Sequence, residues 1–244
     1  MANNRKFSYS PMFNSRGDLK QCLELKGRGK NKVDELPEDV LREVNIIGLD
    51  LTKNNLSQLP PKLRNLRDIE ELYLTKNNFE QFPEVLSTLN NIRVLKLDFN
   101  HLTSLPVCIT RLENVRELWL DGNDFEVFPE AVCDMSGLRE LYIRQNKLTS
   151  LPPSIAKMKG LEIFILSDNQ LVSLPDEIME LTALRELWLL RNKLTSLPPK
   201  LTTGLPNLQK IELTDNQFDE DNLEFIKAVD DGLEALRSYE QSQS

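Results

Sequence analysis

The chain has few of the side chains on which enzyme active sites depend. Its 244 residues include one histidine, His101, and three cysteines, Cys22, Cys108 and Cys133. A Cys/His zinc site or a histidine-activated nucleophile needs more such groups than the sequence supplies. We therefore expect no catalytic residue, no metal site and no cofactor. Because the cysteines are odd in number and lack the spacing of a disulfide framework, we expect a reducing compartment, the cytoplasm.

Long apolar runs and targeting signals are also missing. The first residues, MANNRKFSYS, predict no secretory leader, and no stretch approaches the roughly 20 apolar residues of a membrane span. The net charge of −8 argues against a molecule built to hold nucleic acid. Residues 1–33 are nevertheless basic, so we interpret residues 1–22 as a partly mobile basic arm. Contact of this arm with an acidic partner or anionic lipid is the alternative.

Asparagine, by contrast, recurs at a fixed step along most of the chain. The step is constant until the last interval, which is longer by a single position, through Asn54, Asn77, Asn100, Asn123, Asn146, Asn169, Asn192 and Asn216. The first seven asparagines sit in the phrase L-x-x-L-x-L-x-x-N-x-L-x-x-L-P, in which other apolar residues replace some leucines, such as Phe79 and Phe82. Self-similarity at such a period predicts a stacked array of repeats. The extra residue near Thr203 and Gly204 predicts a local bulge.

The repeated phrase resembles the leucine-rich repeat in its 23-residue form, over residues 46–218. Its Leu-Pro step, as at Leu105 and Pro106, is similar to the intracellular Ras-group class, which includes the Ras suppressor. The resemblance implies an α/β leucine-rich-repeat solenoid, a curved horseshoe of about eight repeats with a parallel sheet on its concave side. It also implies a scaffold or adaptor for protein partners, in signalling or cytoskeletal assemblies.

The two ends of the array require covers, because one repeat cannot bury its apolar residues alone. Residues 23–45 read as a degraded first repeat that serves as an N-terminal cap. Residues 219–239 carry apolar side chains at helical spacing and predict a C-terminal capping helix. Residues 240–244 are left as a tail.

Alternation along each short strand predicts which side chains point outward. Positions four and six of a repeat face the core, and positions three, five and seven face the concave side. Both tryptophans of the protein fall at position five. Since tryptophan, tyrosine and arginine dominate binding energetics, we predict a partner-binding face. Its residues are Tyr73, Lys96, Phe99, Trp119, Tyr142, Arg144, Ile163, Ile165, Trp188, Leu190 and Arg191.

Several alternatives remain open at this point. The rings of the concave face could instead stabilise one another and stack with arginine stems. A pattern-recognition receptor for a microbial or carbohydrate ligand would also use aromatic side chains, and a subunit that inhibits an enzyme is a third possibility. Asp98 and Asp121 share position seven and could hold a cation weakly. We expect a monomer, with dimerisation through the concave face as the alternative.

Overall fold

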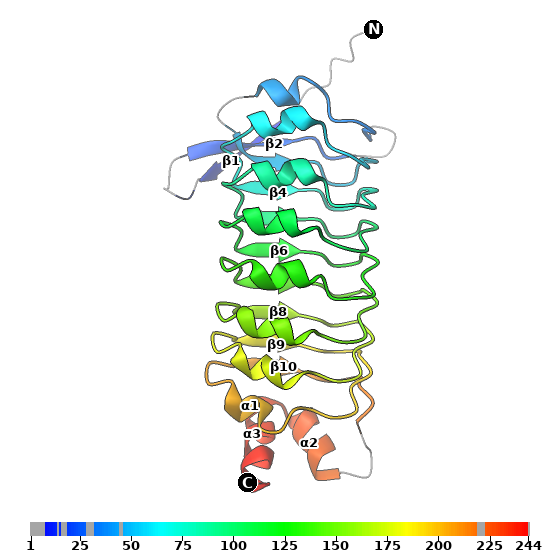
Figure 1. Cartoon of the computed structure of the whole chain (residues 1–244), viewed down its shortest axis with the longest axis vertical. Helices are drawn as coiled ribbons and strands as arrows, with labels where there is room; N and C mark the ends of the chain where they lie inside the picture. The colour runs from blue at the N-terminus through cyan, green and yellow to red at the C-terminus, as the bar shows by residue number, and fades with distance from the viewer. Residues whose placement is uncertain are drawn as a thin grey trace.

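The computed structural model describes residues 8–13, 15, 19–27, 32–43, 46–218 and 223–243. Ten strands form one open sheet, in which each strand pairs with its neighbours in chain order (Figure 1). They are β1 (Ser8–Phe13), β2 (Leu19–Glu24), β3 (Ile46–Asp50), β4 (Glu71–Tyr73), β5 (Val94–Lys96), β6 (Glu117–Trp119), β7 (Glu140–Tyr142), β8 (Ile163–Ile165), β9 (Glu186–Trp188) and β10 (Lys210–Glu212). The strands stack along the long axis of the molecule, which confirms the predicted solenoid.

The sheet is parallel from β2 to β10, and β1 runs antiparallel to β2. From β3 to β9 each strand pairs with the next at the step of the repeat, so that Leu72 faces Leu95 and Leu95 faces Leu118. The constant step of the sequence therefore fixes the register of the strands as well as their order.

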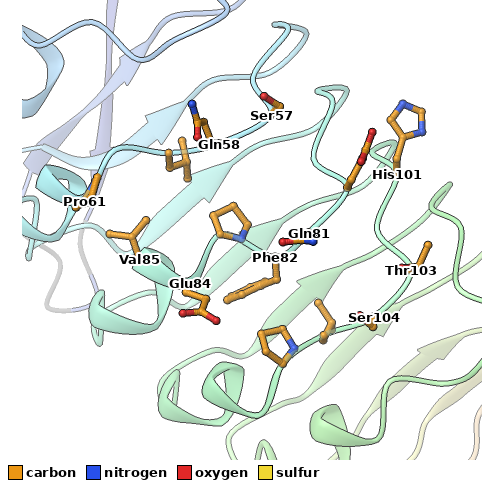
Figure 2. A pocket seen from close by; sticks show the side chains of 15 residues that line it. Ser57, Gln58, Pro61, Gln81, Phe82, Glu84, Val85, His101, Thr103 and Ser104 are labelled. Carbon is orange, nitrogen blue, oxygen red and sulfur yellow. The ribbon is translucent and has the colours of Figure 1, made fainter.

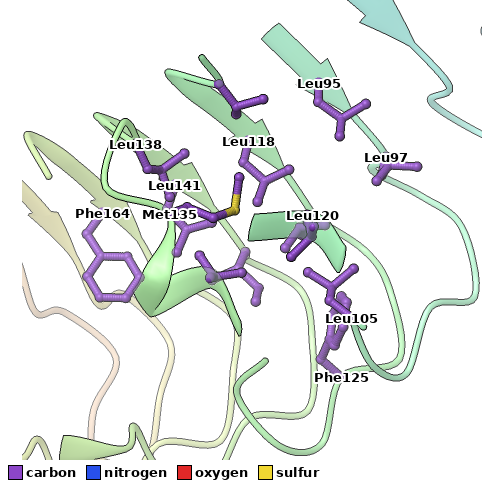
Figure 3. Packing of buried hydrophobic residues seen from close by; sticks show 14 of the residues in the cluster. Leu95, Leu97, Leu105, Leu118, Leu120, Phe125, Met135, Leu138, Leu141 and Phe164 are labelled. Carbon is purple, nitrogen blue, oxygen red and sulfur yellow. The ribbon is translucent and has the colours of Figure 1, made fainter. Parts of the chain in front are cut away.

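Positions four and six of each repeat form the core. Leu95, Leu118 and Leu141 at position four are fully buried, and so are Leu97 and Leu120 at position six (Figure 3). Burial of one such leucine contributes about 1.5–3 kcal/mol. Because each side chain packs against the repeats on either side, the core is one continuous stack along the solenoid.

The repeated asparagine ties each repeat to the one before it. The Asn123 amide nitrogen donates to the carbonyls of Leu120 at 3.0 Å and of Leu97 at 3.1 Å, and its oxygen accepts from the Leu102 N–H at 3.0 Å. Equivalent bonds form at Asn77, Asn100, Asn146, Asn169, Asn192 and Asn216. This side chain thus satisfies backbone groups that the turn leaves unpaired, as predicted.

Short 3-10 helices lie on the side of the repeats away from the sheet. They are η2 (Val40–Arg42), η3 (Pro61–Asn65), η4 (Glu84–Thr88), η5 (Val107–Arg111), η6 (Glu130–Asp134), η7 (Pro153–Lys157) and η8 (Asp176–Glu180). From η3 to η8 each begins directly after the repeat proline. Pro106, for example, is extended at φ −75° and ψ 157°, and its carbonyl accepts from the Ile109 N–H at 3.1 Å. Proline pre-sets this extended approach to the turn.

The extra residue of the last full repeat changes the type of helix at this position. Here the chain forms α1 (Leu201–Gly204), in which the Gly204 N–H donates to the Lys200 carbonyl at 2.7 Å. This bond spans one residue more than the bonds of the 3-10 helices. The expected bulge is therefore absorbed as a single α-helical turn, with Lys200 left-handed at φ 62°.

An antiparallel hairpin covers the N-terminal end. Residues 8–13, part of the predicted arm, form its outer strand β1, while residues 1–7 lie outside the described residues. In the predicted first repeat, Leu23, Val33 and Val40 are buried in the core. The cap is therefore a hairpin followed by a single degraded repeat.

Two helices cover the C-terminal end, where the sequence predicts one. Gly232, with φ 89°, separates α2 (Leu223–Asp231) from α3 (Leu233–Ser242). The Glu240 carboxylate on α3 accepts from the N–H and the hydroxyl of Thr202 at 3.0 and 2.9 Å, which joins α3 to α1. In the described part of the chain, no helix has the length and apolar character needed to cross a membrane.

Candidate functional site

One column of side chains runs along the concave face of the sheet. The register brings together the position-five residues Asp50, Tyr73, Lys96, Trp119, Tyr142, Ile165, Trp188 and Glu212. Adjacent strands lie about 4.8 Å apart, so neighbours in the column contact one another. We call the part from Tyr73 to Trp188 the aromatic column. The predicted alignment of both tryptophans in one column is confirmed.

Trp119 is covered on both faces of its ring. Tyr142 of β7 stacks on it with ring centroids 3.8 Å apart and an interplanar angle of 12°. The Lys96 ammonium of β5 lies 3.9 Å from the Trp119 ring centroid. Since β5 and β7 flank β6 on opposite sides, the two neighbours occupy opposite faces of the indole. Trp119 therefore presents an edge to the concave space.

Lysines also lie over the other rings of the column. The Lys210 ammonium lies 3.9 Å from the Trp188 ring centroid, and the Lys96 ammonium lies 5.6 Å from that of Tyr73. Each such cation–π contact contributes about 0.5–1 kcal/mol at an exposed site. The rings therefore do stabilise the sheet, as one alternative holds, but the cations over them are lysines and not arginines.

Glutamates at position three hold the polar atoms of the rings. The Tyr142 hydroxyl donates to Glu140 at 2.6 Å, and the Trp188 indole N–H donates to Glu186 at 2.9 Å. Residues two apart on a strand share one face, so this arrangement repeats. Burial and the bond to Glu140 raise the pKa of the Tyr142 hydroxyl above its ordinary value, which keeps the phenol a donor.

Trp119 departs from this pairing. Its indole nitrogen is buried and, among the described residues, has no hydrogen-bond partner. The equivalent carboxylate, Glu117, lies near the ring without reaching normal hydrogen-bond geometry. Burial and the neighbouring Glu140 raise the pKa of Glu117. The Trp119 N–H donor and the Glu117 carboxylate acceptor therefore do not form the hydrogen bond seen in the other two repeats.

Position seven carries charges that are already paired. Asp121 is almost fully buried and accepts from the backbone N–H of Arg144 at 2.8 Å and from its Nε at 2.9 Å. Burial raises the pKa of Asp121 to about 6. Asp98 accepts from the Thr75 hydroxyl at 2.8 Å. Both carboxylates considered for a cation are therefore bonded within the chain, and no three metal-ligating side chains cluster among the described residues.

Two predicted binding residues at position eight are also engaged within the chain. The Phe99 ring lies against Gly122, where an added Cβ would come within 2.5 Å of it, and the Lys76 ammonium lies 5.0 Å from the ring centroid. Arg191 forms an ion pair with Asp168. Both side chains belong to the turns that follow the strands.

The apolar part of the face lies over β8 and β9. Ile163, Ile165 and Leu190 are half-buried, and Ile163 stands in register between Glu140 and Glu186.

The N-terminal hairpin packs at the far end of the sheet, where the Ser15 N–H donates to Glu70 at 2.8 Å. Glu70 directly precedes β4, which lies two strands away from β6 in the sheet. The structure thus brings the predicted residues from Trp119 to Leu190 together on one surface.

A pocket lies among the segments that follow strands β3, β4 and β5 (Figure 2). Its volume is about 910 Å³, and its lining includes Ser57, Gln81, Phe82 and Ser104. His101, the one histidine of the sequence, also lines it and lies 3.6 Å from the Asp124 carboxylate. The sequence did not reveal this pocket, because most of its polar side chains occupy positions that the repeat leaves unconstrained.

Comparisons with known proteins agree with this architecture. Residues 136–194 and 159–218 match the family model described as leucine rich repeat. The fold is similar to that of the LRR protein LIC12759 of Leptospira interrogans, with a TM-score of 0.66 and 31% identity over 81% of this chain and 56% of that one. It is also similar to the crystal structure of PEPR1–AtPEP1, with a TM-score of 0.61 and 26% identity over 86% of this chain and 30% of that one.

The chain thus spans less than two thirds of either of these two proteins. A comparison with curated proteins gave no match. The constant step of the repeat, the buried asparagines and the parallel sheet agree with the family match. Residues 136–218 match the leucine-rich-repeat family, and the described array as a whole has the leucine-rich-repeat fold.

Proposed function

We propose that the protein is a non-catalytic scaffold or adaptor that holds a protein partner on its concave face. The aromatic column supplies contact area, and the half-buried Ile163, Ile165 and Leu190 supply an apolar centre beside it. Aromatic side chains placed at the middle of a surface are the usual source of binding energy between proteins. The polar groups around them, Glu140, Glu186 and Arg144, form a rim.

The covered ring faces favour a protein partner over a carbohydrate. A sugar stacks its C–H groups on the open face of an aromatic ring, but Tyr142 and Lys96 occupy both faces of Trp119. Lys210 likewise occupies one face of Trp188. The ring edges that remain carry positive potential and suit the carbonyl and apolar groups of a polypeptide. This covering of the rings is the observation on which the proposal rests.

Two further arguments support a cytoplasmic location and a role in signalling or cytoskeletal assemblies. Cys22, Cys108 and Cys133 are all free thiols in the structure, which suits the cytoplasm. The resemblance to the Ras-group repeats suggests signalling or cytoskeletal assemblies. Because this second argument is an analogy between folds, the partner must be identified by experiment.

The test is capture of partners from cell lysate by the wild-type protein and by a Trp119→Ala/Trp188→Ala variant, with identification of the bound molecules. Since Trp119 also supports the sheet, we expect the variant to be less stable by about 1–3 kcal/mol. Capture is therefore compared at equal amounts of folded protein, measured by circular dichroism. The variant should lose the proteins that the wild type retains.

A matched control is the Val107→Ala/Val127→Ala variant, which removes two exposed apolar side chains outside the concave face. This control should capture the same proteins as the wild type. Equal capture by the folded tryptophan variant would refute the proposal. A set of ligands that contains only glycans would replace the scaffold by a carbohydrate receptor.

A further inference from the structure

Three carboxylates form a line beside the aromatic column. Glu117, Glu140 and Glu186 occupy position three of β6, β7 and β9, and each is half-buried. We call them the carboxylate stripe. Two of them are held in place by ring donors, because Glu140 accepts from Tyr142 and Glu186 accepts from Trp188. The stripe is therefore ordered before any partner arrives.

Two lysines lie near this stripe, each with its ammonium 3.9 Å from a tryptophan ring centroid. Lys210 is in register with Glu186, and the charge of Lys96 lowers the pKa of Glu117. On this face Arg144 pairs with Asp121 and Arg191 pairs with Asp168. In the described part of the chain, no ion pair includes a member of the stripe. The tyrosine and tryptophan donors that hold Glu140 and Glu186 are neutral, so those bonds leave the negative charge in place.

The arginines at position two point elsewhere. Arg116 donates to the backbone carbonyls of Glu113 and Val115 at 3.1 and 3.2 Å, and Arg139 donates to that of Leu138 at 2.9 Å. These guanidinium groups therefore bond to the turns that precede the strands and do not bond to the stripe.

Two members of the stripe also repel each other. Glu117 and Glu140 are directly in register on adjacent strands, where like charges are destabilising. Burial and Glu140 raise the pKa of Glu117, in agreement with this crowding. A cation between the two carboxylates would remove the repulsion.

The spacing of the stripe defines what could bind along it. With strands about 4.8 Å apart, the centre of the Glu117–Glu140 pair lies roughly 12 Å from Glu186. Ile163 lies between, about 7 Å from the pair. In an extended peptide, side chains on one face recur about every 6.8 Å. Two cations four residues apart span about 13.6 Å, close to the roughly 12 Å between the pair and Glu186. The apolar residue between them falls near Ile163, which is about 5 Å from Glu186.

We propose that the concave face takes an extended basic segment of a protein, with the pattern cation-x-apolar-x-cation across the carboxylate stripe. One cation lies between Glu117 and Glu140, the apolar side chain lies on Ile163, and the second cation pairs with Glu186. This inference depends on the proposed protein-binding function and specifies the chemistry of the partner.

The test uses the fluorescein-labelled peptide GSRSLSRSG and its acidic counterpart GSESLSESG. Fluorescence anisotropy should show that the wild-type protein binds the basic peptide and not the acidic one, and that added salt weakens binding. Glu140→Gln and Glu186→Gln should each raise Kd about twofold to fivefold, the contribution of one partly exposed charge pair. Glu126→Gln, which removes the same charge away from the concave face, should leave Kd unchanged.

Several results would overturn the inference. These are no binding of the basic peptide at up to about 1 mM, equal binding of the acidic peptide, or an unchanged Kd in both stripe variants. Circular dichroism of each variant verifies that it is folded. If the tryptophan variant loses its partners while the stripe variants keep them, the binding face stands and the basic partner does not. If neither set loses partners, both proposals fail.

Discussion

Position eight of the repeat is the residue with the most unusual backbone. Its members are left-handed in every repeat, with φ between 53° and 61°, at Lys53, Lys76, Phe99, Gly122, Gln145, Asp168, Arg191 and Asp215. Seven of the eight are not glycine, so the conformation alone does not require glycine. Gly122 differs because the ring of Phe99 occupies the space where its Cβ would stand.

Gly122→Ala should therefore destabilise the protein by about 2–4 kcal/mol, the sum of a strained φ and an overpacked ring. In a Phe99→Ala background the same change should cost only about 1 kcal/mol, because the clash is gone. Urea denaturation of the four proteins in this cycle measures the difference. An equal cost in both backgrounds would show that the ring is not responsible.

The carboxyl group of Asp121 makes the stability of the folded protein depend on pH. Its pKa, raised to about 6 by burial, exceeds the value of about 3.9 in an unfolded chain. The folded state therefore binds more protons at Asp121 between these values, so the contribution of Asp121 to stability is highest below about pH 4 and is lost as the pH rises to about 6. The loss is at most about 3 kcal/mol.

Asp121→Asn should reduce this slope, as measured by urea denaturation at several pH values. It should not abolish the slope, since burial also raises the pKa of Asp98 and Glu117. Asp168→Asn, which removes a more exposed carboxylate that is also paired with an arginine, is the control and should keep the slope. The assignment is wrong if Asp121→Asn and wild type respond to pH identically.

At the scale of elements, the period of the sequence predicts the strands, their register and the inward positions. Leu118 and Trp119 could be assigned to opposite faces because a strand alternates and its register follows the step of the repeat. The contacts among the outward side chains could not be predicted this way. The stacking of Trp119 on Tyr142 and the bond from Trp188 to Glu186 depend on rotamers that no periodicity specifies.

The asparagine bonds provide a test of how the elements hold together. Asn146→Ala would leave the Phe125 N–H and the carbonyls of Leu120 and Ile143 without their partner, at a cost of about 2–5 kcal/mol. Asn216→Ala removes the same bonds at the more exposed end of the array and should cost less. Chemical denaturation would contradict this account if the two costs were equal.

On the scale of the whole molecule, each repeat is stabilised by contacts with its two neighbours. The end repeats have one neighbouring repeat each and are therefore the least stable. The sequence predicts that both ends are covered but not how. The N-terminal hairpin depends on pairing between residues outside the repeat. At the other end, Gly232 divides the predicted helix, since its φ of 89° does not continue a helix. Neither feature follows from the repeat pattern.

Glu240 allows the C-terminal cover to be loosened selectively. Glu240→Ala removes its bonds to Thr202 and Thr203, each of which contributes about 0.5–1.5 kcal/mol. Hydrogen exchange followed by mass spectrometry should become faster in α1 and β10 while β6 and β7 keep the wild-type rate. Uniformly faster exchange would instead mean that the array unfolds as one unit.

The reversed direction of β1 also limits how these molecules can join. A parallel solenoid could in principle lengthen without end if the last strand of one copy docked on the first strand of the next. Here the outermost strand runs the opposite way and contains Pro11, which has no backbone hydrogen to donate. This edge therefore differs from the parallel edge that head-to-tail stacking would continue, which disfavours such growth at this end.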